Sequence, residues 1–251
     1  MTRVRIDHAF ETLRIFLDHA LGIDSSQKQI VSGRQLTAAL ISAASHNTYV
    51  ETVSDKADTL NRHIKSGLTS MGTHAYLEQT ERFARIKDWK TKKVILAIDY
   101  TDEDFYGNVQ GFDIHGWTGE HGVKGKFKFL TCSIVSDEVS EKIPLLSIPI
   151  KIGHYKSQVI FYLLSLVKPL FDEIDLILFD RGFYDKDLMY ELKKANYPYL
   201  IFVPKQRDKQ EILYGLENND HIAIKNEFTI NKDKTNYHDE NYLVFLKNIF
   251  C

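Results

Sequence analysis

The chain has 251 residues, of which 43% are hydrophobic and 26% are charged, and this balance excludes an intrinsically disordered protein. Its formal net charge of −2 excludes a global basic signature of nucleic-acid binding, so any contact with DNA must use local positive charge. Two cysteines are too few for a structural zinc site or a disulfide framework, and no apolar run is long enough to span a bilayer. We therefore expect an intracellular protein without a membrane contact.

Residues 1–90 are predicted to be helical. Phe10, Leu13 and Leu17 recur at helical spacing, and Ser32 followed by Gln35 is typical of a capping box. Ser54 is predicted to cap a further helix, and another is expected over residues 73–86. A small excess of basic residues suits a DNA-binding bundle. A helical cap on the following domain explains the pattern equally well, and both interpretations stay open.

Residues 91–205 are predicted to form an α/β domain with two helices, over 154–170 and 185–195. Pro144 and Pro149 interrupt an apolar stretch that we interpret as an extended edge or connector. The last strand–helix–strand unit has the spacing of a parallel crossover. The predicted strands cover 94–99, a stretch near 109–117, 126–135, 174–180 and 197–203.

Residues 206–251 change to polar, β-leaning sequence. Strands are expected over 221–230 and 242–246, with Glu227 in the first of them and Glu240 in a polar turn.

Asp99 and Asp180 each end a buried hydrophobic strand. Functional groups of α/β sheets gather beyond the carboxyl ends of strands, so the two carboxylates converge if their strands are neighbours. Two close anions repel each other, and a divalent cation removes that cost. Carboxylate oxygens without a nearby Cys or His cluster favour Mg²⁺ or Mn²⁺ over zinc.

Each aspartate also has an ordinary structural interpretation. Asp180 precedes Gly182 and a predicted helix, which is typical of a helix N-cap or a turn. Asp99 precedes a dense acidic stretch, residues 100–104, that is typical of a solvated loop. The matched context of the pair favours the metal site.

Two motifs resemble those of insertion-sequence DDE transposases of the IS-four group, from archaea and bacteria. Asp180-Arg181-Gly182-Phe183-Tyr184, after the strand Leu176-Ile177-Leu178-Phe179, is similar to the second-aspartate box of that family. Ala97-Ile98-Asp99-Tyr100-Thr101-Asp102 is similar to its first-aspartate strand. Residues 125–135 resemble the strand that follows. The resemblance covers residues 93–205.

The resemblance implies an RNase H-like fold, in which a mixed five-stranded sheet is flanked by helices. Asp99 is then the first catalytic, metal-binding carboxylate, on the first strand, and Asp180 is the second, on the fourth strand. It also implies a β-rich insertion after the fifth strand, which matches the change of character after Lys205. We therefore expect a helical region over 1–90, a catalytic core over 91–205 and an incomplete insertion over 206–251.

The third carboxylate of the family is a glutamate on a helix within a Tyr-x-x-Arg-x-x-x-Glu motif, and this sequence contains no such motif. Neither Glu227 nor Glu240 has the right setting, so the third position is unknown. We expect the chain to end inside the insertion. A two-carboxylate chain is expected to bind metal weakly and to cut DNA poorly or not at all.

The implied function is metal-dependent cleavage and strand transfer of transposon-end DNA by a prokaryotic, cytoplasmic nuclease and strand transferase. Double-stranded DNA and a second protomer, giving a homodimer, are the implied partners. Two alternatives stay open: a truncated, inactive DNA-binding remnant, and a metal-dependent phosphohydrolase that uses Asp99 and Asp102.

Basic residues near the predicted site are candidate DNA contacts, although charge runs are more often solvated surface. Arg181 either contacts phosphate or fixes Asp180 through an ion pair. Trp117 is a weak candidate for base stacking. The remaining basic candidates are Lys124, Lys126, Lys128, Lys205, Arg207 and Lys209.

Overall fold

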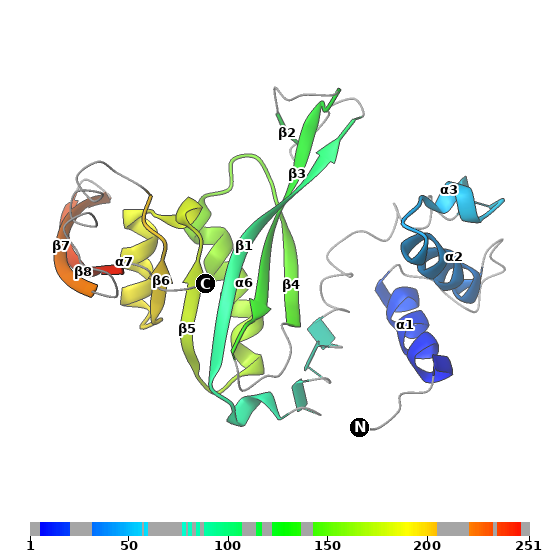
Figure 1. The fold of residues 1–251 in the computed structure, drawn as a ribbon, viewed down its shortest axis with the longest axis horizontal. Helices are drawn as coiled ribbons and strands as arrows, with labels where there is room; N and C mark the ends of the chain where they lie inside the picture. The colour runs from blue at the N-terminus through cyan, green and yellow to red at the C-terminus, as the bar shows by residue number, and fades with distance from the viewer. Residues whose placement is uncertain are drawn as a thin grey trace. The chain divides into compact units, whose positions relative to one another are not determined.

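The computed structural model forms two compact units, residues 1–90 and 91–251, each described here by itself (Figure 1). The described residues are 6–20, 32–56, 58–59, 77–78, 80–81, 84–85, 88–106, 114–116, 122–136, 143–204, 221–232 and 235–246.

Among its described residues, the first unit contains helices α1 (Ile6–Ala20), α2 (Gly33–Ser45) and α3 (Val50–Val53), and residues 58–59, 77–78, 80–81 and 84–85 are also helical. The predicted capping box is confirmed, because the Ser32 side chain accepts from the Gln35 N–H and the Gln35 side chain accepts from the Ser32 N–H. Ser54 follows the end of α3, and its hydroxyl accepts from the Lys56 N–H at 3.2 Å. Residues 58–59 are helical, and most of the helix that Ser54 was predicted to cap lies outside the described residues. Within the predicted helix 73–86, every described residue is helical.

The second unit is built on a mixed sheet. Its long first strand β1 is antiparallel to β3 and parallel to β5, and β6 continues the parallel side. β4 and the short β2 pair with successive stretches of the outer edge of β3. The bounds are β1 (Val94–Phe105), β2 (Ile114–Gly116), β3 (Gly125–Ile134), β4 (Ile143–Ile150), β5 (Ile174–Phe179) and β6 (Tyr199–Ile201).

The resulting order, β4-β3-β1-β5-β6, is the mixed five-stranded arrangement of the RNase H-like fold, so the predicted fold class is confirmed. One strand assignment was wrong. The second core strand is β3, not the stretch near 109–117, whose described part is only β2. The third core strand is β4, which contains Pro144 and Pro149. An edge strand tolerates these prolines because its outer N–H groups need no partner in the sheet.

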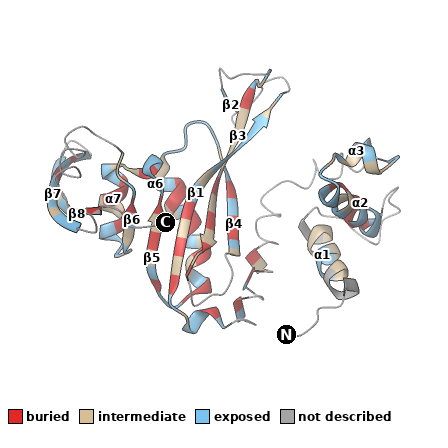
Figure 2. Cartoon of the chain, viewed as in Figure 1, coloured by how far each residue is buried: buried red, intermediate tan, exposed pale blue. Residues whose placement is uncertain are grey.

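Buried residues alternate with less buried ones along the strands of this sheet (Figure 2), so its two faces differ in burial. One face, which we call the covered face, carries the fully buried side chains of alternate strand positions, such as Leu96, Leu130 and Ile177. Helix α6 (Lys156–Val167) contacts β3 and β4 and buries Ile160 and Leu163. The other face, which we call the open face, carries side chains that are only half-buried or exposed: Ile95, Ala97, Thr131, Ser147, Leu176, Leu178, Leu200 and Phe202.

Helix α7 (Lys186–Lys194) follows β5 and the 3-10 turn η3 (Arg181–Phe183). Its N-cap is Asp185, whose side chain accepts from the Leu188 N–H at 2.9 Å. Leu188 and Leu192 are fully buried, so the cap fixes the start of a helix that contributes to the core.

We predict that removing this cap measurably lowers the stability of the protein. We expect Asp185→Ala to lower the free energy of unfolding by about 1 kcal/mol, because the first turn of α7 loses its side-chain acceptor. Urea denaturation measures the change as a lower midpoint with an unchanged m-value. Asp185→Asn keeps an acceptor oxygen and should stay close to the wild type. Equal losses for both variants would show that the cap is not the cause.

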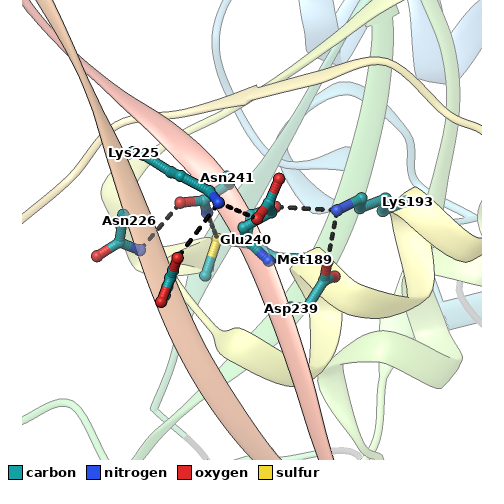
Figure 3. Close-up of polar contacts among 8 residues, drawn as sticks. Met189, Lys193, Lys225, Asn226, Asp239, Glu240 and Asn241 are labelled. Carbon is teal, nitrogen blue, oxygen red and sulfur yellow. Dashed lines mark hydrogen bonds and ion pairs between the residues drawn. The ribbon is translucent and has the colours of Figure 1, made fainter.

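A hairpin of β7 (His221–Lys232) and β8 (Thr235–Leu246) forms a separate sheet beside α7 (Figure 3). Lys193 of α7 lies 2.5 Å from Asp239, and Asn241 donates to the Met189 sulfur at 3.0 Å. Lys232 forms a further ion pair with Glu191. The hairpin is therefore fastened to α7 by polar contacts.

Candidate metal centre

Asp99 and Asp180 occupy neighbouring positions on the open face of the sheet. The last registered pair of the parallel strands β1 and β5 is Ile98 with Phe179, and each aspartate is the next residue of its strand. Asp180 keeps an extended backbone, with φ −69° and ψ 165°. Neighbouring strands lie about 4.8 Å apart. Because Ile98 and Phe179 are each 1% exposed on the covered face, alternation places both carboxylates on the open face, where they are exposed.

Asp180 is the N-cap residue of η3, and its carbonyl accepts from the Phe183 N–H at 3.0 Å, so it begins a turn as its structural interpretation predicts. Its side chain, however, makes no capping hydrogen bond, and the side-chain cap of α7 is Asp185. The Asp180 carboxylate stays available at the surface for another ligand.

Asp99 does not lie at the start of a loop. Strand β1 continues to Phe105, paired with β3 along its whole second half, so the predicted acidic loop is a strand. The reason lies across the sheet, where Asp102 is registered with Lys128 and Asp104 with Lys126. These opposite charges stabilise a pairing that the acidic side chains alone disfavour.

The same pairing bears on two predicted DNA contacts. Lys126 lies 3.5 Å from Asp104 and 3.9 Å from Asp102, and Lys128 lies 4.0 Å from Asp102. By strand alternation both lysines lie on the opposite side of the sheet from Asp99. Their charges are partly compensated within the protein, which weakens the prediction that they follow a DNA backbone beside the aspartates.

The remaining predicted contacts have different surroundings. Arg181 is exposed, and within the described residues no ion pair joins it to Asp180, so it does not fix that carboxylate. Lys124 is exposed beside the end of β1, where its N–H donates to the Phe105 carbonyl. Lys205, with Arg207, Lys209 and Trp117, lies outside the described residues.

An aromatic stack holds the two aspartate-bearing segments together. The Tyr100 ring, directly after Asp99, stacks on the Phe183 ring of η3 with centroids 4.3 Å apart and planes 9° from parallel. The Phe183 ring also packs against the Phe179 ring, with centroids 5.3 Å apart, and Phe183 is 1% exposed. Burial, with a smaller effect of the Asp185 charge, raises the pKa of Tyr100 to about 12, so its phenol is neutral at physiological pH. By joining β1 to η3, the stack therefore helps to fix the distance between Asp99 and Asp180.

The two carboxylates fit a divalent cation. They are adjacent and exposed, and neither is paired with a basic side chain in the described part of the chain. Two such anions repel, and a hard cation with oxygen ligands relieves the repulsion. Across the described ranges, no group of three or more His, Cys, Asp and Glu side chains is placed to hold one metal ion. Within that part of the chain, the site therefore offers two carboxylates to a cation.

The acidic residues of the hairpin do not extend this site. Glu227 and Glu240 face each other on β7 and β8, and Lys225 pairs with them at 3.2 and 2.6 Å. Glu227 lies in a strand, as predicted, whereas Glu240 lies in β8 and not in a turn. Both carboxylates are engaged with this lysine.

Sequence reasoning missed a set of hydroxyl groups beside the aspartates. Thr131 of β3 is registered directly with Asp99, and Ser147 of β4 is registered with Thr131. The Thr131 hydroxyl lies 2.9 Å from that of Ser147 and 3.4 Å from that of Thr101. The alternation along β3 puts Thr131 on the same face as Phe127 and Phe129. The sequence does not show that Thr131 lies opposite Asp99, because that depends on the register between β1 and β3.

No protein-family model matches the sequence, and no curated protein matches it. Among solved structures, the chain is similar to the piggyBac transposase in its synaptic complex with hairpin DNA, with a TM-score of 0.40 and 13% identity over 96% of this chain and 52% of that chain. It is similar to the Drosophila P element transposase in its strand transfer complex, with a TM-score of 0.33 and 13% identity over 79% of this chain and 48% of that chain.

A third similar structure is the Mos1 mariner paired end complex with Mn, with a TM-score of 0.28 and 11% identity over 82% of this chain and 70% of that chain. The chain thus spans about half the length of the first two of these proteins. Likeness of this degree concerns the arrangement of helices and strands, and the RNase H-like assignment rests on the strand order itself. No helix among the described residues is long and apolar enough to cross a membrane.

Proposed function

We propose that this chain is the catalytic core of a DDE-type DNA transposase of the insertion-sequence kind, close to the IS-four group. The observation that carries the proposal is the placement of Asp99 and Asp180 side by side on the open face of an RNase H-like sheet. The Asp-Arg-Gly-Phe-Tyr box that begins at Asp180 supports it from the sequence.

In the proposed reaction, Asp99 and Asp180 would hold the catalytic Mg²⁺ or Mn²⁺. When bound, a pair of such ions activates the attacking oxygen and stabilises the leaving oxygen of an in-line displacement at phosphorus. Water displaces the 3′-oxygen at the element's end, and the freed 3′-hydroxyl then displaces an oxygen of a target phosphodiester. The chain positions these carboxylates through β1, β5 and the Tyr100–Phe183 stack. The partners are duplex DNA and a second copy of the chain, because two ends are joined.

A second candidate is a DNA-binding protein without catalysis. It is favoured by the two-ligand site, since no third carboxylate joins Asp99 and Asp180 among the described residues. A small-molecule phosphohydrolase that uses Asp99 with Asp102 is disfavoured. Alternation places these two side chains on opposite faces of β1, and Asp102 lies near Lys126 and Lys128.

One set of assays separates these functions. We expect the full chain to bind a fluorescein-labelled DNA duplex with an affinity that falls as salt rises. We expect only slow nicking of supercoiled plasmid in Mn²⁺, abolished by Asp99→Asn or Asp180→Asn while duplex binding persists.

Duplex binding without any nicking favours the non-catalytic candidate. Hydrolysis of p-nitrophenyl phosphate that is blocked by Asp99→Asn, in a chain that does not bind the duplex, favours the phosphohydrolase. The first result contradicts catalysis by this chain, and the second contradicts the proposed function as a whole.

A further inference from the structure

Four polar residues occupy neighbouring positions on adjacent strands of the open face. Strand register places Asp180 beside Asp99, Asp99 opposite Thr131, and Thr131 opposite Ser147. They therefore form a row across β5, β1, β3 and β4, at right angles to the strands. Three inter-strand spacings make it roughly 14 Å long. We call its uncharged part, Thr131 and Ser147 together with Thr101, the hydroxyl row.

The hydroxyl row has one proton more than its internal bonds use. Its three hydroxyls carry three protons, and the two contacts of 2.9 and 3.4 Å that join them use two. One O–H is therefore left over: that of an end hydroxyl if the two bonds run in one direction, or that of Thr131 if both ends donate to it. Hydrogen bonds in series polarise one another, so this remaining O–H is a better donor than an isolated hydroxyl. Thr101 and Ser147 at the two ends are exposed.

Such a donor suits an anion that lies across the sheet beside the metal. Thr and Ser hydroxyls are common hydrogen-bond donors to DNA phosphate oxygens. They are uncharged, so they do not change the net charge of a site that already contains two aspartates. Consecutive phosphates of one strand of duplex DNA lie farther apart than their rise of about 3.4 Å along the axis, so a row of this length spans the cleaved phosphate and its one or two nearest neighbours. With the cleaved phosphate at the aspartates, the neighbouring phosphates lie over β3 and β4.

We propose that the hydroxyl row is a phosphate-binding subsite for the DNA strand that flanks the cleaved phosphate. The proposal rests on the proposed function, since it takes DNA as the ligand. Thr131 is the central residue, because it bonds to both other hydroxyls and its loss interrupts the row whichever end faces the DNA.

The test measures the affinity of the full chain for a fluorescein-labelled duplex by anisotropy, in Ca²⁺ to prevent cleavage and over a series of salt concentrations. Thr131→Val is expected to raise Kd about tenfold at fixed salt. The slope of log Kd against log salt should not change, because a neutral donor displaces no counterion. Thr131→Ser keeps the hydroxyl and should restore the affinity. Ser165→Ala removes an exposed hydroxyl from α6, which packs on the covered face, and should bind as the wild type.

An unchanged Kd for Thr131→Val overturns the subsite and leaves the proposed function standing. A changed salt slope also overturns it, because the variant has then altered a charged contact. Failure of Thr131→Ser to restore binding assigns the loss to packing and not to the hydroxyl. A wild-type chain that binds no duplex overturns the subsite and the proposed function together.

Discussion

Asp99→Asn should abolish the stabilisation of this chain by Mn²⁺ while slightly raising its melting temperature in the absence of metal. The two effects have opposite signs because the aspartates repel each other when no cation is bound. At Mn²⁺ about 100 times above Kd, a site that exists only in the folded state contributes about 2.7 kcal/mol. For a chain of this size that is a rise in melting temperature of several degrees. Differential scanning fluorimetry with and without MnCl₂ measures both the melting temperature of the metal-free chain and its rise with Mn²⁺.

Asp180→Asn should behave in the same way, because the two carboxylates share the site. Asp175→Asn is the matched control. Asp175 is an exposed aspartate at the beginning of β5, whereas Asp180 directly follows the end of that strand. The Asp175→Asn variant should keep the full response to Mn²⁺. If Asp99→Asn still responds to Mn²⁺ as the wild type does, the cation binds elsewhere.

Phe183→Ala should lower the free energy of unfolding of the second unit by about 3–5 kcal/mol, because a large side chain is removed from a packed site. Phe183 is 1% exposed and packs on both Tyr100 and Phe179. The loss also frees η3 from β1, so the Mn²⁺-dependent rise in melting temperature should shrink. Urea denaturation measures the first effect and scanning fluorimetry the second.

Tyr100→Phe is the control for this stack. It keeps the ring and removes a hydroxyl whose pKa is already raised by burial, so we expect a stability within about 1 kcal/mol of the wild type. A small loss for Phe183→Ala, comparable to that of Tyr100→Phe, would show that the stack does not hold the two segments together.

The positions of the central strands β1, β3, β5 and β6 were predictable because the apolar runs that encode them are local. Each apolar run, such as residues 94–98, is short, continuous and bounded by polar sequence, and the spacing from β5 to β6 requires a parallel crossover. The edge strand β4 was harder to assign, since Pro144 and Pro149 read as interruptions. They are tolerated because one side of an edge strand has no partner to bond.

The length of β1 was not predictable from its own residues. Aspartates such as Asp102 and Asp104 are intrinsically poor strand formers. They are tolerated in β1 because Asp102 lies opposite Lys128 and Asp104 lies opposite Lys126. That pairing joins residues more than 20 positions apart in the sequence, so no local pattern contains it.

The candidate site was predicted in part. The strand context of Asp99 and Asp180 selected both aspartates, and whether they act as metal ligands stays a prediction. The competing interpretation of Asp180 as a helix cap required a contact that the sequence cannot specify, and in the structure Asp185 makes that contact. The hydroxyl row depends on register across β1, β3 and β4, which is a property of the folded sheet.

We expect Asp99 and Asp180 to hold a divalent cation together. Crystals of the full chain grown with MnCl₂, measured at the manganese absorption edge, test it directly. We predict an anomalous peak between the two carboxylates, about 2.1 Å from an oxygen of each, as hard divalent cations require. Anomalous density that lies elsewhere, with none between Asp99 and Asp180 at saturating Mn²⁺, would contradict the account.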